Sequence, residues 1–457
     1  MTSSHRQNSS PWGAIGFTLL LALAAGAPFP YGAVLPAGEL RIELAAFGCL
    51  ALAFLSRPWR GWLGEAAFPA AAVGAIAAVG LLQLVPLSES ALAQISPISA
   101  KIYHETAEIL GSAQPKISIA PTDTVRTILL TLAYLALFFA AAILLRTRTR
   151  RRVFAAVLVG ASAIEIAVSA LSAGVEERLH GPFINPDHFA GYLEISLALA
   201  FGTLWREILT GGDSPRGIEE GAARMERRIL RLGGWILLWG FLASGVVLTR
   251  SRGGILAASL TALGLVAGGL ASRRRAGRLR TLTAAGVALL FGLLFVAGAT
   301  KREAILRFLA SDPRDMGADL RVGIWKTSIE ASRSFPILGS GLGSFREAFR
   351  RFQPRGMEGL VEQAHCDALQ LLVTGGWVGL ALGILLVGSL FAALARALAR
   401  QRHREEKAFV LAGMGALASL VLHGLVDFNM SIPAIPATLA AVLGAAWAAG
   451  RDERGRE

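Results

Sequence analysis

The chain carries one long apolar run after another, and this repetition constrains its fold more than any other feature of the sequence. A helix that crosses a bilayer needs roughly 20 mostly apolar residues, because every backbone N–H and C=O must be hydrogen-bonded within the helix where water is absent. Of the 457 residues, 54% are hydrophobic and only 17% are charged. The sequence therefore predicts an all-α, polytopic membrane protein with about 12 transmembrane helices, and it excludes a soluble globular domain.

The predicted spans are distributed along the whole chain. We expect them near residues 12–34, 40–56, 66–86, 125–145, 153–173, 188–209, 233–249, 253–272, 281–299, 371–395, 408–427 and 432–449. Two connections on one side of the membrane are long, at residues 87–124 and 300–370, and connections of such length fold on their own or carry function. We predict a single membrane domain over residues 1–457, in which the second long loop caps the outer face.

The distribution of Lys and Arg orients the predicted helices. Basic clusters such as Arg146 to Arg152 and Arg273 to Arg280 fall in short connections on the side opposite the two long loops. Short loops rich in Lys and Arg stay in the cytoplasm, so both ends of the chain are predicted to be cytoplasmic. The net charge of +13 is then mostly a topology signal. Nucleic-acid binding is not expected, because no aromatic platform accompanies the basic clusters.

Two arginines in a short outer turn depart from this charge rule. Arg250 and Arg252 lie in Leu-Thr-Arg-Ser-Arg-Gly-Gly, between two predicted spans, so both side chains reach the outer interface. The plain interpretation is that they mark the interface by snorkelling. We favour a ligand role toward headgroups or a phosphate, because the positive-inside rule makes an arginine pair in a short outer turn unexpected.

The large loop contains a short amphipathic helical pattern at residues 345–352. Phenylalanines gather on one face of this helix and arginines on another, at Phe345, Phe349 and Phe352 and at Arg346, Arg350 and Arg351. Either the helix lies on the outer leaflet and meets anionic headgroups, or it is a lid packed on other helices with its arginines solvated. The sequence leaves both interpretations open.

His365 stands about six residues before a predicted span, where an imidazole can titrate near neutral pH. Asp367 is close enough in sequence to help to orient it, although a lone histidine is more often structural. His423 and Asp427 are four residues apart and share one helix face, and we expect a hydrogen-bonded pair that fixes the last two spans.

Other polar residues give weaker signals. Glu165 and Glu194 lie within predicted spans, either as relay carboxylates or as neutral, hydrogen-bonded acids. The outer loops contain neither an Asp-x-Asp motif nor a cluster of His and Cys, so we predict no metal and no other cofactor.

Four segments, in this order, resemble the O-antigen ligase and O-antigen polymerase superfamily of bacterial envelope glycosyltransferases. They are residues 181–194 with Asn185 and His188, the Ser-Arg-Gly turn of 248–254, the stretch 321–345 with Arg321, Trp325 and Gly339-Ser340-Gly341-Leu342-Gly343, and residues 365–379, which are similar to a His-Asn-Asp signature. Cys366 stands where asparagine is usual and Thr374 where glutamate is common. These departures leave the acceptor preference open.

The resemblance implies a donor, an acceptor and residue roles. Its members take a glycan from undecaprenyl pyrophosphate at the periplasmic face of the inner membrane and pass it to a hydroxyl of lipid A core, of another lipid-linked repeat or of a protein. His365 would be the general base, and Arg252 and Arg321, with Arg250, would bind the departing pyrophosphate. Supporting roles fall to Asp367, Trp325, Asn185, His188, His423 and Asp427. For Arg250, Asn185 and His188, interfacial anchoring or helix capping is an equal alternative.

The sequence therefore predicts a metal-independent, O-antigen ligase-like glycosyltransferase of lipopolysaccharide or surface polysaccharide biosynthesis. An O-antigen or exopolysaccharide polymerase is the alternative within the superfamily. A polytopic transporter or flippase is the alternative from another class, but we find no convincing internal repeat, and the polar residues gather at the outer face instead of mid-membrane.

Overall fold

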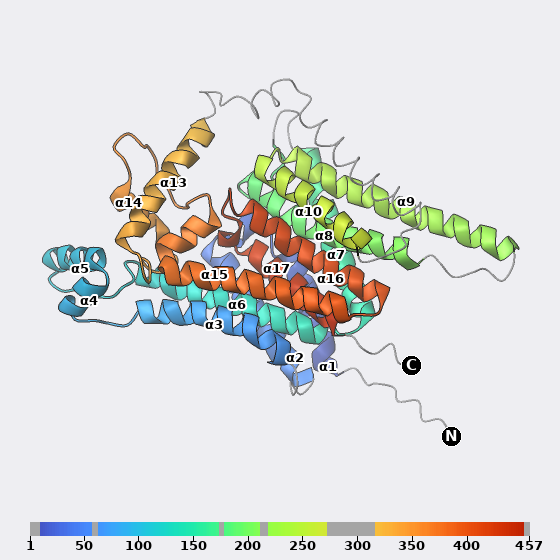
Figure 1. The fold of residues 1–457 in the computed structure, drawn as a ribbon, viewed down its shortest axis with the longest axis horizontal. Helices are drawn as coiled ribbons and strands as arrows, with labels where there is room; N and C mark the ends of the chain where they lie inside the picture. Colours follow the sequence, from blue (N-terminus) through green and yellow to red (C-terminus); the bar gives the residue numbers. More distant parts are fainter. Residues whose placement is uncertain (1–9, 57–62, 173–177, 211–217, 272–315, 452–457) are drawn as a thin grey trace.

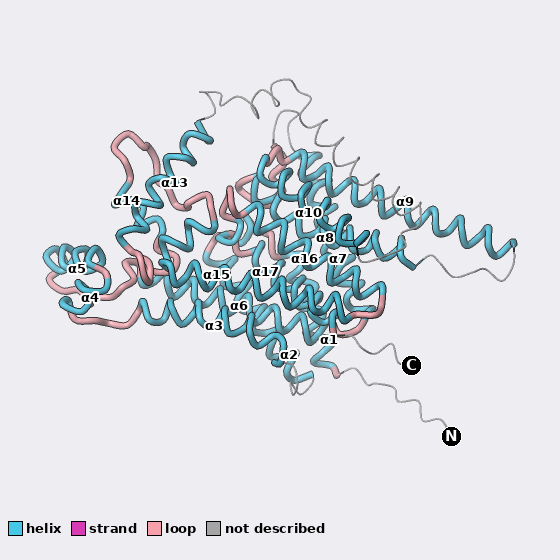
Figure 2. Tube along the Cα trace, in the orientation of Figure 1, coloured by secondary structure: helices cyan, strands magenta, loops and turns pink. Residues whose placement is uncertain are grey.

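The structure is a computed structural model that describes residues 10–56, 63–172, 178–210, 218–271 and 316–451. Within these ranges the chain forms α-helices and short 3-10 turns and contains no strand, which confirms the all-α prediction (Figure 2). The main bundle comprises α1 (Pro11–Gly26), α2 (Pro36–Ser56), α3 (Leu63–Gln83), α6 (Pro121–Leu144), α7 (Arg148–Ser172), α8 (Pro186–Thr210), α9 (Ile218–Leu248), α10 (Arg252–Ala271), α15 (Asp367–Arg400), α16 (Arg404–His423) and α17 (Ala434–Gly450). The predicted span at 281–299 lies outside the described residues.

Many of the bundle helices are apolar enough to lie in a bilayer. Five could cross a membrane by length and composition, at Pro121–Leu144, Arg148–Ser172, Met225–Leu248, Asp367–Arg400 and Arg404–His423. Shorter apolar helices occur at Pro11–Gly26, Ala67–Gln83, Arg252–Ala267 and Ala434–Gly450. These helices support a membrane protein, while the number of spans stays a prediction.

The centre of the bundle is built on close helix contacts at small residues. α16 packs along α8, and α17, whose residues are nearly all buried, packs along α6. A Cβ added at Gly444 of α17 would lie 2.3 Å from the backbone oxygen of Phe138, and one at Gly202 of α8 would lie 2.8 Å from that of Ala408. Such contacts let helix backbones approach closely where side-chain burial from water provides no driving force.

Four further helices gather at one end of the bundle, at the left of Figure 1. They are α4 (Glu89–Ile95), α5 (Pro97–Leu110), α13 (Met316–Ser334) and α14 (Phe345–Phe352). Phe345 and Phe349 of α14 are buried against α13 and α15, and Arg351 forms an ion pair of 3.0 Å with Glu105 of α5. Of the two interpretations of residues 345–352, the structure shows the packed lid.

A glycine-rich segment fastens this lid to the bundle. Gly339 has a φ of +75°, and a Cβ there would lie 2.3 Å from the carbonyl carbon of Thr374. The Gln83 side chain at the end of α3 donates to the Thr374 oxygen at 2.9 Å and accepts from Leu342 N at 2.8 Å. Residues 339–343 therefore close onto α3 and α15, and they fix the start of α15 beside which His365 lies.

Candidate functional site

His365 is held in an unusual backbone conformation immediately before α15. Its φ of 49° lies in the left-handed region, which residues other than glycine seldom adopt. The indole of Trp325 on α13 donates to the His365 carbonyl at 3.2 Å, and Asp367 N donates to Gly424 O at 2.8 Å. Strained residues persist only where their surroundings fix them, and they cluster at functional sites.

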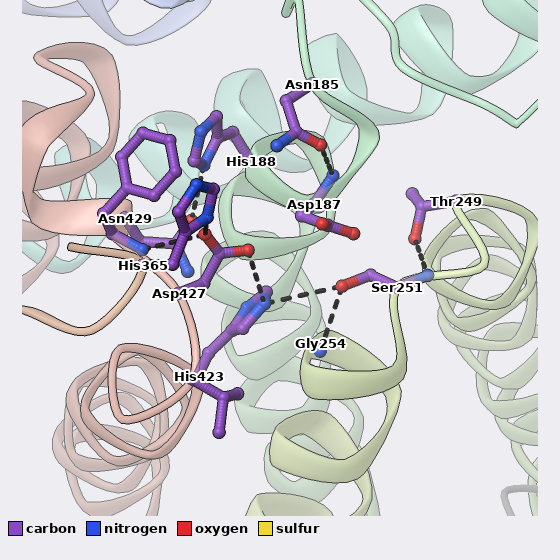
Figure 3. Close-up of polar contacts among 12 residues, drawn as sticks. Asn185, Asp187, His188, Thr249, Ser251, Gly254, His365, His423, Asp427 and Asn429 are labelled. Carbon is purple, nitrogen blue, oxygen red and sulfur yellow. Dashed lines mark hydrogen bonds and ion pairs between the residues drawn. The ribbon is translucent and has the colours of Figure 1, made fainter. Parts of the chain in front are cut away.

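Asp427 is the centre of the polar cluster around His365 (Figure 3). Its Oδ1 lies 3.9 Å from His365 Nδ1, and its Oδ2 lies 3.9 Å from both His423 Nε2 and Arg321 Nη2. The Asp427 side chain is only 2% exposed. These distances allow ion pairing but exceed the length of a hydrogen bond, so three cationic or titratable groups share one buried carboxylate without being locked to it.

A second buried carboxylate supports this cluster from deeper in the bundle. Glu194 of α8 has one oxygen 2.8 Å from His423 Nδ1, while its other oxygen accepts from Ser419 Oγ at 2.7 Å. His423 is therefore closer to Glu194 than to Asp427, its expected hydrogen-bond partner. The chain Glu194, His423, Asp427 and His365 alternates acids with imidazoles across α8, α16 and the start of α15.

One aromatic ring contacts both His365 and a second histidine. His188, near the start of α8, is buried, and its Nδ1 lies 3.2 Å from Asn429 Oδ1. The Phe428 ring stands edge-to-face to both imidazoles, with centroid distances of 4.5 Å to His188 and 4.7 Å to His365. These contacts fix the position of both imidazole rings.

Arg321 reaches the cluster from α13 and remains one-third exposed. Its Nη2 lies 3.2 Å from Asp187 Oδ2, and its Nη1 donates to Val426 O at 3.3 Å. Asp187 also forms an ion pair with Arg178, whose Nε donates to Thr249 O at 2.8 Å. A partly exposed guanidinium beside His365 is thus held from several sides while part of it faces outward.

The turn between α9 and α10 contributes Ser251 directly to the site. Its Oγ lies 3.5 Å from His423 Nε2, and Arg250 and Arg252 on either side of it are exposed. A Cβ at Gly254 would lie 2.7 Å from Ala190 and 3.2 Å from the His423 ring, so this turn approaches α8 and α16 closely because residue 254 is glycine. The two arginines therefore flank a residue of the cluster.

Two predicted supporting residues, Asp367 and Asn185, accept hydrogen bonds from backbone N–H groups. The Asp367 carboxylate accepts from Met430 N at 3.3 Å, so it fixes the segment after Asp427 instead of facing the imidazole of His365 as expected. Asn185 accepts from Asp187 N at 2.9 Å, which is the capping role at the start of a helix.

The electrostatic surroundings favour a neutral His365. Burial, and next the positive charge of Arg321, hold the pKa of His365 below the usual value of histidine, while Asp427 acts in the opposite direction. At neutral pH the imidazole is then unprotonated and able to accept a proton. Among the residues that the structure describes, no group of three or more His, Cys, Asp or Glu side chains is arranged to hold a metal ion.

Several residues of the cluster were not predicted as site residues, among them Asp187, Phe428, Glu194 and Ser251. One signal was available, because Asp187 and Glu194 are seven residues apart and so share one face of α8, and the next charged residue of that helix is Arg206. Phe428 carries no comparable signal, since an aromatic residue at the end of a span is ordinary.

Residues 236–384 match the family model of O-antigen ligase. This places that region in the O-antigen ligase and polymerase superfamily, as the sequence resemblance predicted. The matched region is about a third of the chain and contains Arg252, Arg321, Trp325 and His365, whereas Asp187, Glu194, His423 and Asp427 lie outside it. No curated protein matches the chain. The match and the apolar helices together support a glycosyltransferase-like membrane enzyme of polysaccharide biosynthesis in the bacterial envelope.

Proposed function

We propose that the protein transfers a glycan from undecaprenyl pyrophosphate to an acceptor hydroxyl at the periplasmic face of the inner membrane, in the manner of an O-antigen ligase. The observation that carries this proposal is that His365 and Arg321 both lie 3.9 Å from the same carboxylate, Asp427. Glycan transfer must remove a proton from the acceptor and neutralise charge on the departing pyrophosphate, and it therefore needs a base close to a cation.

His365 takes the acceptor proton in this mechanism. With Nδ1 facing Asp427, the ring can carry its own proton on Nδ1 and receive the acceptor proton on Nε2. Asp427 then stabilises the imidazolium that forms. The lowered pKa of His365 suits this role, because the imidazole is already neutral before the acceptor binds.

The arginines act on the leaving group. As the acceptor oxygen bonds to the anomeric carbon, the bond from that carbon to the pyrophosphate oxygen breaks, and undecaprenyl pyrophosphate departs with the electron pair. Arg321 is exposed enough to meet these oxygens, and Arg252 and Arg250 flank Ser251 at the same site. Because guanidinium groups carry the charge, we propose that a chelator leaves the rate unchanged.

Reconstitution with a defined donor tests the proposal. Purified protein in nanodiscs receives an undecaprenyl-pyrophosphate-linked glycan and lipid A core, and the products are separated on a gel. Glycan on lipid A core supports the ligase, whereas longer glycans with unmodified lipid A core indicate the polymerase of the same superfamily. Uptake of a labelled solute into proteoliposomes without glycan transfer would contradict the proposed enzymatic function and indicate a transporter.

Deletion of the gene gives the same distinction in cells. Loss of all glycan from lipid A core supports the ligase, and a product with a single repeat indicates the polymerase. If only a secreted polymer is lost, the result indicates that the protein acts in exopolysaccharide biosynthesis.

A further inference from the structure

The end of the bundle opposite His365 contains a cavity of about 210 Å³. It lies between α7, α8, α9 and α16, where α7 and α16 begin and α8 ends. The His365 cluster lies at the start of α8 and the end of α16. Along α16 the lining ends at Ala412, about three turns before His423, so the cavity is separate from that cluster, and the proposed glycan transfer does not use it.

The mouth of the cavity is basic. Its charged lining residues are Arg148, Arg151, Arg152, Arg206, Glu405 and Glu406. Arg151 and Arg148 bind the two oxygens of Glu406 at 2.7 and 2.9 Å, and Arg152 and Arg206 both approach Glu405. Glu207 pairs with Arg206 at 2.5 Å. Four guanidinium groups thus share three carboxylates, and positive charge is in excess.

The charged and apolar parts of the lining occupy different depths. Ala155 and Ala156 lie one turn beyond Arg151 and Arg152 along α7, and Leu199 lies about two turns inward from Arg206 on α8. Phe409 and Ala412 likewise follow Glu405 and Glu406 into α16. The cavity therefore has a cationic mouth and an apolar interior, which is the profile of a lipid headgroup above the start of its acyl chains.

We propose that this cavity binds an anionic phospholipid, with its phosphate against Arg206 and Arg152 and its acyl region against the apolar lining. Basic pockets between transmembrane helices are suited to acidic lipid headgroups, and arginine forks pair with phosphate oxygens. The apolar interior favours a lipid over a free phosphate, which would leave that part of the cavity empty. Further arginines and a lysine flank the mouth in sequence, at Arg146, Arg150, Arg402, Arg404 and Lys407.

Lipid-dependent stability and native mass spectrometry test this assignment on the full-length protein in neutral detergent. Phosphatidylglycerol or cardiolipin should raise the melting temperature and remain bound in the mass spectrum, while phosphatidylcholine should do neither. A rise with inorganic phosphate equal to that with phosphatidylglycerol would show a free-phosphate site and overturn the lipid assignment. Equal effects of phosphatidylcholine and phosphatidylglycerol would also overturn it.

Two variants locate the binding. Arg206→Gln removes one guanidinium and should weaken phosphatidylglycerol binding about fivefold, the equivalent of about 1 kcal/mol per basic residue. Ala156→Trp fills the cavity from an exposed position without changing charge, and it should displace the lipid. Arg231→Gln, on the exposed face of α9, is the matched control and should bind as the wild type does. Unchanged lipid binding in both Arg206→Gln and Ala156→Trp would refute the site.

Discussion

The two ends of α8 and α16 use charged residues in opposite ways. At the beginning of α16, Glu406 binds Arg151 at 2.7 Å and Arg148 at 2.9 Å. Beyond the other end, Asp427 stands 3.9 Å from each of His365, His423 and Arg321. Both carboxylates are 2% exposed. Equal burial therefore goes with tight pairing of Glu406 and with loose pairing of Asp427.

This difference separates a structural role from a chemical one. A buried pair at hydrogen-bond distance has its charge fully compensated, and removal of one partner leaves an isolated charge in the protein. A carboxylate that lies farther from two imidazoles and a guanidinium can shift slightly when one of the imidazoles gains or loses a proton. We therefore expect mutations at the Glu406 end to affect folding, and mutations at the Asp427 end to affect rate and pH dependence.

The largest effect should come from His365. His365→Ala removes the proposed base, and the rate of glycan transfer should fall by roughly 10² to 10⁴, the usual contribution of general base catalysis. The melting temperature should stay near that of the wild type. His104→Ala, an exposed histidine on α5, is the control and should retain full activity. Full activity of the His365→Ala variant would contradict a catalytic role for this end of the bundle.

Glu406→Gln should instead lower the stability of the protein and leave the rate of glycan transfer unchanged. The change leaves Arg151 buried with its charge uncompensated, and breaking a buried pair in this way costs about 3 to 5 kcal/mol. Thermal unfolding in detergent should show a much lower melting temperature, while the folded fraction transfers glycan at the normal rate. A melting temperature equal to that of the wild type would mean that tight pairing at this end contributes little to stability.

Two substitutions around Asp427 should shift the pH dependence of activity in opposite directions. Arg321 lowers the pKa of His365, so Arg321→Gln should raise that pKa, and the loss of activity on acidification should begin at higher pH. Asp427 raises the same pKa, so Asp427→Asn should move the loss to lower pH. Profiles of kcat/KM against pH measure both shifts. Shifts in one common direction would show that these residues act through the fold and not through charge on His365.

The smallest effect is expected on the lid. Arg351→Gln breaks an ion pair with Glu105 in which both side chains are at least 32% exposed, and such pairs contribute about 1 kcal/mol or less. The melting temperature should change little, and the transfer rate in nanodiscs should depend on anionic lipid to the same extent as in the wild type. A weaker dependence on anionic lipid in Arg351→Gln than in the wild type would restore the headgroup-binding interpretation of residues 345–352.

The sequence predicted the helical architecture because its signals are local. Apolar length indicates a span, and the described helices of the main bundle overlap the predicted ranges, whereas α4, α5 and α13 lie in the segments predicted as long loops. The packing of the lid could not be predicted from the sequence, because Phe345 and Phe349 form the same pattern whether the apolar face meets lipid or protein. Only the position of α13 and α15 decides between them.

The candidate site was predicted in part, for reasons of the same kind. His365 and Arg321 followed from the resemblance, whereas the position of Asp427 between them depends on how α13, α15 and α16 converge. Asp367 is only two residues from His365, but the left-handed backbone at His365 and the start of α15 direct the two side chains to different partners. Proximity in sequence is therefore a poor guide at a strained turn.

Chemical rescue tests the central claim most directly. His365→Gly removes the imidazole and leaves space for free imidazole, and glycan transfer is measured over a range of pH with and without added imidazole. The proposed mechanism predicts a very slow reaction that added imidazole accelerates, in proportion to the concentration of its neutral form. A rate in His365→Gly that equals the wild-type rate, or that imidazole does not change at any pH, would contradict a base at this position.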